Sequence, residues 1–203
     1  MLDSSHVLTL GLTDRQNRII QDHLESLDCT LSVAKDYHDL TDSHYFISVV
    51  NTQVLEEDAI RNLTEYYTEV DGSLTEKVIL APGEDALSRA AHALVFPDFA
   101  ALEAVLGSVL QKAHTRAKRE ENTIHNISSV LVILREIRSH PGMTTADLAE
   151  KISRNDAAVR RYIEALRMMG EPILYDEKTK SWKLEHDQSV LLGDIDKELV
   201  HAE

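Results

Sequence analysis

Short apolar runs alternate with amphipathic stretches along the first 118 residues. Five runs of four to six residues predict buried strands, at residues 6–10, 30–34, 45–50, 77–81 and 93–96. Apolar side chains at helical spacing predict helices at residues 13–27, 53–70, 84–91 and 97–118. A turn is predicted at residues 71–73, after the second of these helices. Strands that alternate with helices in this way build a parallel sheet covered on both faces. Residues 1–118 are therefore predicted to form an α/β domain with a five-stranded, doubly wound sheet.

The rest of the chain has a different pattern, in which three helical stretches precede two short strands. Apolar positions from Ile124 to Ile137 predict the first helix, and Thr144 and Asn155 are suited to cap two further helices. A short turn separates those two helices, and a hairpin of strands follows them. This order predicts a winged helix-turn-helix over residues 119–187. The apolar positions of the tail, residues 188–203, are compatible with one more short helix.

The boundary between the two predicted domains lies in residues 116–122. This stretch is polar and contains neither glycine nor proline. The last helix of the first domain could therefore continue through it, or the stretch could be a flexible linker.

Charge and cysteine content narrow the classes of function. The net charge of −14 argues against a broad, non-specific binder of polyanions. The charge is unevenly distributed, because residues 1–119 carry 10 basic against 19 acidic side chains, whereas residues 151–183 carry 8 against 5. A single cysteine, Cys29, allows no internal disulfide, which favours a cytoplasmic protein. No signal peptide and no apolar run of about 20 residues are visible, so we expect no membrane association.

Several motifs of the second domain resemble the DeoR-like winged helices of bacterial regulators. They are Ala146–Glu150, Val159–Leu166, Glu171–Ile173 and Trp182–Leu184. The resemblance implies that the third helix reads bases and that the wing contacts the DNA backbone or minor groove. The resemblance also identifies seven residues as candidates for contact with DNA: Arg154, Asn155, Arg160, Arg161, Lys178, Lys180 and Lys183.

Three other residues of this region have structural explanations. Asp156 suits the positive N-terminus of a helix, although it would repel phosphate. Tyr175 and Trp182 are predicted to pack the wing against the core.

The first domain resembles the receiver domain of response regulators in length, in element order and in its closing Phe96-Pro97. The residues that bind Mg²⁺ and accept phosphate in that family are missing. Gly11 and Leu12 follow the first strand in place of an acidic pair, and Asn51 occupies the phosphoacceptor position. Phe96 replaces the lysine expected before Pro97. The resemblance therefore implies a degenerate receiver that is not phosphorylated and has no metal or cofactor.

These patterns predict a transcriptional regulator that binds double-stranded DNA and is not an enzyme. The sequence has no Gly-rich phosphate loop, no nucleophile motif and no metal-ligand spacing of Cys and His. We expect a homodimer, formed through the receiver-like domain or through the helix at 98–118, whose apolar stripe is either core or a dimer seam. That stripe contains Phe99, Leu102, Leu106, Val109, Leu110 and Ala113. The alternative is a winged-helix module that binds another protein and does not bind DNA.

Overall fold

The computed structural model describes residues 4–42, 45–69, 75–185 and 189–192. The chain divides into two compact units, which meet between Asn122 and Thr123. Each unit has its own hydrophobic core.

The N-terminal unit contains a five-stranded parallel sheet in the order β2-β1-β3-β4-β5. Its strands are β1 (His6–Leu10), β2 (Thr30–Val33), β3 (Ile47–Asn51), β4 (Glu76–Leu80) and β5 (Leu94–Phe96). Its helices are α1 (Asp14–Glu25), α2 (His38–Asp42), the 3-10 turn η1 (Thr52–Val54), α3 (Glu57–Glu69), α4 (Ala86–Ala90), α5 (Phe99–Glu103) and the first part of α6 (Leu106–Ser139). The strand order reverses direction beside β1, which confirms the predicted doubly wound α/β sheet.

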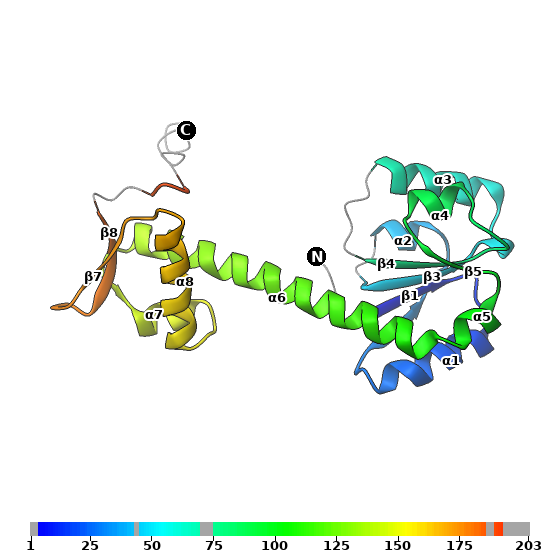
Figure 1. The fold of residues 1–203 in the computed structure, drawn as a ribbon, viewed down its shortest axis with the longest axis horizontal. Coiled ribbons are helices and arrows are strands. Elements are labelled where there is room, and N and C mark those ends of the chain that lie inside the picture. The colour runs from blue at the N-terminus through cyan, green and yellow to red at the C-terminus, as the bar shows by residue number, and fades with distance from the viewer. Residues whose placement is uncertain (1–3, 43–44, 70–74, 186–188, 193–203) are drawn as a thin grey trace. The chain divides into compact units, whose positions relative to one another are not determined.

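Helices cover both faces of this sheet (Figure 1). Alternate strand residues point to opposite faces, so Val7 packs with α1, α5 and α6 while Leu8 packs with α2, α3 and α4. Both residues are at most 2% exposed, and both faces are therefore closed. This burial explains why the strands are continuous apolar runs rather than alternating ones.

Two helical predictions for this unit need correction, and one helix was missed. The short helix α2 (His38–Asp42) was not predicted, because five residues are too few to show a helical period. The helix predicted for 53–70 is divided into η1 and α3. The helix predicted from Pro97 begins at Phe99, where Asp98 caps it, and is divided into α5 and α6. The predicted turn at 71–73 lies outside the described residues.

The helix α6 runs without a break through residues 116–122 and across the division between the units. The helical connection, one of the two alternatives at this boundary, is therefore the correct one. The apolar stripe predicted as core or dimer seam is core, because Phe99, Leu102, Leu106 and Leu110 are at most 8% exposed in the N-terminal unit. A dimer seam along that stripe is excluded, since its side chains are already packed.

The C-terminal unit has the predicted order of elements. The end of α6 is followed by β6 (Met143–Thr144), α7 (Thr145–Lys151), α8 (Asp156–Met168), β7 (Ile173–Asp176) and β8 (Ser181–Leu184). The strands form a three-stranded antiparallel sheet in the order β6-β8-β7. Its core takes side chains from every element, among them Ile133, Leu148, Val159, Ile163, Ile173 and Leu184. In the part of the chain that is described, no helix is both long and apolar enough to span a bilayer.

Candidate nucleic-acid interface

The turn between α7 and α8 fixes the start of the third helix of the helix-turn-helix. Ser153 takes a positive φ of 52°, which reverses the chain after α7. The side-chain oxygen of Asn155 then accepts a hydrogen bond from the backbone N–H of Ala158 at 2.9 Å and caps α8. This cap satisfies one of the free N–H groups at the helix start, as the sequence predicted for Asn155.

A cavity of about 570 Å³ lies beside the N-terminus of α8. It is lined by Asn126, Arg154, Asn155, Ala157, Ala158, Arg161 and Tyr162. Three of the seven predicted DNA contacts, Arg154, Asn155 and Arg161, therefore share one concave surface. Two guanidinium groups beside a helix N-terminus provide the positive charge and the N–H donors that a phosphate requires.

Asn126 is part of this surface and was not predicted as a site residue. Its side-chain oxygen accepts a hydrogen bond of 2.6 Å from the hydroxyl of Tyr162, which joins α6 to α8. The amide NH₂ of Asn126 remains as a donor on the cavity wall. No sequence signal indicated this role, because it depends on a contact between residues that are 36 positions apart.

The arginines of α8 divide into two groups. Arg160 and Arg161 are exposed, and neither side chain has a hydrogen bond or ion pair to another described residue. Arg167 is structural: its Nε donates to the carbonyl of Ile173 at 2.9 Å, and its guanidinium lies 5.3 Å from the centroid of the Trp182 ring. Arg160 is not among the residues that line the cavity. Adjacent residues on a helix are about 100° apart, so Arg160 and Arg161 face different directions.

Asp156 is the first residue of α8 and is exposed. It lies where a carboxylate stabilises the positive end of a helix. Its charge also reduces the positive potential beside Arg154 and Arg161, and it is the feature of this surface least suited to DNA.

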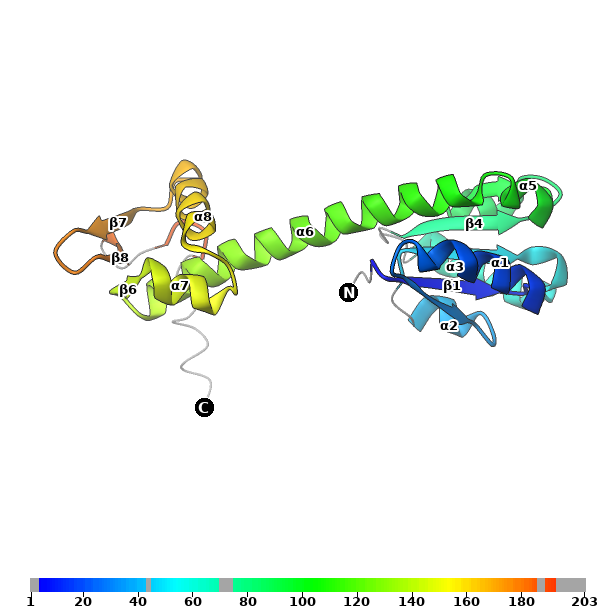
Figure 2. The ribbon, with the colours of Figure 1, turned by 90° about the horizontal axis from the view of Figure 1, so that it is seen from below.

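The wing is a four-residue turn, 177–180, between β7 and β8 (Figure 2). One carboxylate oxygen of Asp176 accepts hydrogen bonds from the backbone N–H groups of Lys178 and Thr179, at 2.9 and 3.3 Å. These bonds, that from Lys178 first, lower the pKa of the Asp176 carboxyl. The tip is therefore held from inside by a charged acceptor.

The three predicted wing lysines are all exposed but differ in their surroundings. The ammonium of Lys183 lies 3.8 Å from Asp176, in a surface ion pair. Lys180 takes a left-handed conformation with a φ of 53°, whereas Lys178 does not. Lys178 and Lys180 thus present their charges at the tip, whereas the charge of Lys183 is partly neutralised by Asp176 at the base of the turn.

Trp182 attaches the wing to the rest of the unit. Its indole N–H donates to the hydroxyl of Thr145 at 3.0 Å, and its ring lies 4.6 Å from that of Tyr175, centroid to centroid. Trp182 is 8% exposed and Tyr175 is 42% exposed. Trp182 is therefore a packing residue, whereas Tyr175 packs on one side only.

In the N-terminal unit, the carboxyl ends of β1 and β3 are closely packed. A Cβ atom on Gly11 would lie 2.7 Å from the side chain of Val54 and 3.0 Å from the carbonyl oxygen of Asn51. The Asn51 amide oxygen accepts from the backbone of Gln53 at 3.2 Å, and the Gln53 amide donates to the Pro97 carbonyl at 3.1 Å. Neutral amides and an apolar side chain therefore fill this end of the sheet, and none of the three residues Asn51, Gln53 and Val54 is acidic.

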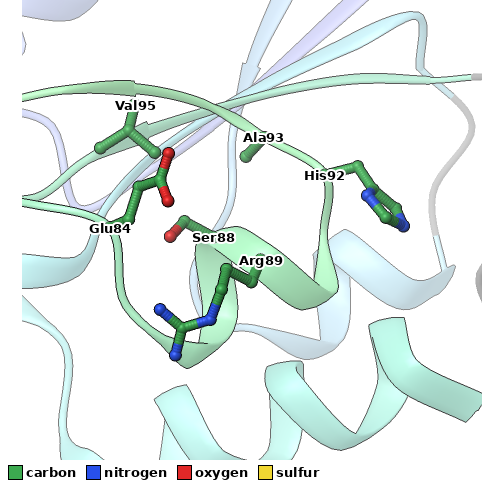
Figure 3. A pocket seen from close by; sticks show the side chains of 6 residues that line it. All are labelled: Glu84, Ser88, Arg89, His92, Ala93 and Val95. Atoms are coloured by element: carbon green, nitrogen blue, oxygen red, sulfur yellow. The ribbon is translucent and has the colours of Figure 1, made fainter.

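A second cavity, of about 380 Å³, lies against α4. Figure 3 shows its lining, which comes from the loop before α4, from α4 itself, from the loop that follows α4 and from β5. The Ser88 hydroxyl is committed to Asp85, to whose carbonyl it donates at 3.0 Å. Glu84, Arg89 and His92 are left as the polar groups that could contact a ligand there.

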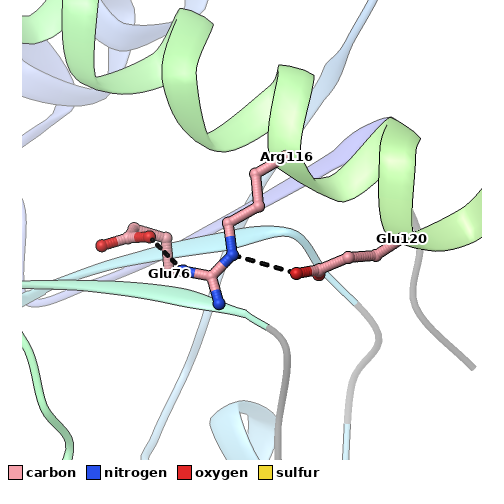
Figure 4. Close-up of polar contacts among 3 residues, drawn as sticks. All are labelled: Glu76, Arg116 and Glu120. Carbon is pink, nitrogen blue, oxygen red and sulfur yellow. Dashed lines mark hydrogen bonds and ion pairs between the residues drawn. The ribbon is translucent and has the colours of Figure 1, made fainter.

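Arg116 joins α6 to the first residue of β4, Glu76 (Figure 4). Its guanidinium lies 3.0 Å from Glu120 on the same helix and 3.4 Å from Glu76 on β4. The hydrogen bond and charge of Glu120 raise the pKa of Arg116 above its ordinary value. These two ion pairs, in which Arg116 is exposed and both glutamates are half-buried, orient α6 locally and contribute little stability.

Comparison with known proteins gives one result for the C-terminal unit. Residues 130–178, from the end of α6 into the wing, match a family described as an HTH domain. No curated protein is significantly similar to the chain. The C-terminal unit therefore contains a helix-turn-helix domain, in agreement with its three helices and antiparallel wing.

Proposed function

We propose that this protein is a DNA-binding transcriptional regulator of the DeoR-like kind. The observation that carries the proposal is the surface at the start of α8, where Arg154, Asn155 and Arg161 gather beside a cavity of about 570 Å³. The match of residues 130–178 to an HTH domain supports the same function. In such domains the third helix lies in the major groove, with its first turns against base edges.

The two exposed arginines of α8 have different roles in this proposal. Arg161, together with Arg154 and the Asn126 amide, holds a backbone phosphate in the cavity and sets the position of the helix. Arg160 does not line the cavity and is assigned to base edges, where a guanidinium binds guanine through two hydrogen bonds. Lys178 and Lys180 hold a second stretch of backbone from the wing.

The N-terminal unit is proposed to be a receiver-like domain that responds to something other than phosphorylation. Asn51 cannot form an acyl phosphate as an aspartate does, and Val54 and Gln53 fill the space around it. The cavity against α4, with Glu84, Arg89 and His92 on its wall, is a candidate position for a small polar ligand. We also propose that the regulator acts as a homodimer, since helix-turn-helix proteins usually read paired half-sites.

The test of DNA binding is selection of genomic fragments by the full-length protein, followed by titration of the best fragment. Arg160→Ala combined with Arg161→Ala is expected to weaken binding at least a hundredfold, because two charged contacts are lost. Arg61→Ala is the matched control, since Arg61 is an exposed arginine paired with Asp58 on α3. If the double variant binds as tightly as the Arg61 variant, the function is wrong, and the alternative of a protein-binding winged helix takes its place.

A further inference from the structure

One face of α6 within the C-terminal unit is apolar and exposed. Ile124, Ile127 and Leu131 are 43, 56 and 47% exposed. They follow the spacing i, i+3, i+7, so they fall within about 60° of one another around the helix axis. We call these three residues the α6 stripe.

The α6 stripe has no part in the unit's own core. The core of this unit takes Ile133, Leu134 and Ile137 from α6, which are fully buried. Asn126, which binds Tyr162, points toward α8 from a different side of the helix. Residues 121–128 are all exposed, and the hydrogen bonds from Ser4 to Glu121 and from Tyr162 to Asn126 are made by polar side chains outside the stripe. An exposed row of large apolar side chains on a helix is a candidate contact surface.

The charge around the stripe indicates what covers it. Residues 122–134 contain no Asp, Glu, Lys or Arg, although 28% of the whole chain is charged. A nucleic acid would require cations here, and a charged peptide would require charges of the opposite sign. Two copies that carry −14 each repel one another, so a contact between them is favoured where neither contributes charge.

We infer that two copies of this chain associate by pairing their α6 stripes, with Ile127 at the centre of the contact. The inference rests on the proposed function and names the surface that brings two recognition helices together. Ile127 is the middle residue of the stripe, so it meets its own copy whether the two helices run parallel or antiparallel. The contact extends over about 12 Å of helix, at 1.5 Å per residue, so we expect self-association that depends on protein concentration.

Sedimentation of the full-length protein over a range of concentrations, without DNA, tests the inference. Ile127→Glu is expected to weaken self-association at least tenfold, because two carboxylates would face each other in an apolar contact. Glutamate is a better helix former than isoleucine, so the helix itself is not weakened. Met168→Glu is the matched control, since Met168 is 83% exposed on α8 and away from the stripe. The inference is overturned if the wild type is monomeric throughout, or if both variants associate equally.

Oxidative cross-linking gives a second measurement. The single native cysteine, Cys29, is buried, so the wild type is the background. Ile127→Cys is expected to form disulfide-linked dimers, because side chains at the centre of a two-helix contact come within disulfide reach. His125→Cys lies in the same exposed segment but off the stripe, and it should form few. Equal cross-linking at the two positions would contradict the inference.

These outcomes separate the dimer contact from DNA binding. If Ile127→Glu is monomeric and binds a single half-site, with weaker binding to a paired site, both proposals stand. If Ile127→Glu is monomeric but neither the wild type nor this variant binds DNA, the contact stands and the proposed function fails. If Ile127→Glu remains dimeric and binds DNA normally, the contact is wrong and the proposed function stands.

Discussion

Lys180 has a backbone conformation that costs stability, but its side chain supplies a positive charge at the tip of the wing. It takes a left-handed conformation, with a φ of 53°, at a position of the wing turn where glycine would be unstrained. A residue with a Cβ pays about 1 kcal/mol for this conformation. Side chains kept at strained positions often have a function, and here the side chain carries a charge at the tip of the wing.

Replacement of Lys180 by glycine is therefore expected to separate stability from binding. Lys180→Gly should raise the free energy of unfolding of the C-terminal unit by roughly 0.5–1 kcal/mol and weaken DNA binding several-fold. Lys178→Gly, at a position without a positive φ, should weaken binding without the gain in stability. Urea unfolding and DNA titration measure the two effects. A loss of stability in Lys180→Gly would contradict the explanation.

His114 is expected to make the N-terminal unit sensitive to pH. Burial, and then the charge of Lys118, lower the pKa of this imidazole below its ordinary value of 6.5. The unfolded chain therefore binds the proton first as the pH falls, and the folded state loses stability from about pH 6.5 downward through the lowered pKa.

Substitution of this histidine tests the sign of that effect. The ring of His114 lies 5.4 Å from that of Phe46, centroid to centroid, in an apolar environment that a leucine also suits. His114→Leu should make stability depend less on pH between pH 7 and pH 5, as measured by urea unfolding at each pH. Parallel pH dependences for the two proteins would show that His114 is not responsible.

At the scale of elements, the middle of α6 is notable because residues 121–128 are all exposed. Asn122→Pro would remove one backbone hydrogen bond there and clash with the preceding turn, at a cost of about 3 kcal/mol to the helix. We expect a smaller helical signal in circular dichroism and faster amide exchange in residues 116–128, with both hydrophobic cores intact. Asn122→Ala is the control and should strengthen the helix. An unchanged exchange pattern in Asn122→Pro would mean that the segment is not helical in solution.

The strands and the helix-turn-helix could be predicted from sequence because each is specified locally. Buried strands such as His6–Leu10 are continuous apolar runs, and Thr144 and Asn155 cap their helices through residues three positions away. The path through residues 116–122 could not be predicted, since composition alone allows both a helix and a linker. The stripe from Phe99 to Ala113 was ambiguous for a related reason: a core face and a dimer seam have the same helical period.

The candidate DNA surface was only partly predictable. Arg154, Asn155 and Arg161 lie close together in the sequence, and a single turn brings them to one surface. Asn126 joins them only through its bond to Tyr162, so its position depends on how α6 packs on α8. Contacts of this kind are set by tertiary structure and leave no pattern in one sequence.

At the scale of the whole molecule, the acidic balance makes DNA binding dependent on a few cations. The net charge is −14, and residues 151–183 have an excess of three basic side chains, 8 against 5. Each phosphate that is neutralised contributes about −0.9 to the slope of log affinity against log salt concentration. Arg161→Ala, which removes a proposed phosphate contact, should reduce that slope by about one.

Arg160→Ala, at the proposed base contact, should instead relax the preference for sequence. Titration of both variants on a matched and a mismatched fragment, at several salt concentrations, distinguishes the two roles. If the two variants change the salt slope equally and the sequence preference equally, the assignment of Arg161 to phosphate and Arg160 to bases is wrong.

The packing around Gly11 also constrains how this chain can change. An aspartate at position 51 would supply a carboxylate like the acceptor of a receiver domain, but the Cβ atom of an acidic residue at position 11 would lie 2.7 Å from the side chain of Val54. The backbone at Gly11, with a φ of 72°, would resist any side chain as well. A carboxylate at position 11 would therefore require more space beside Val54 and a different backbone conformation at the same time. A smaller residue at position 54 would have to come before any side chain at position 11, so these substitutions are tolerated in one order and not in the other.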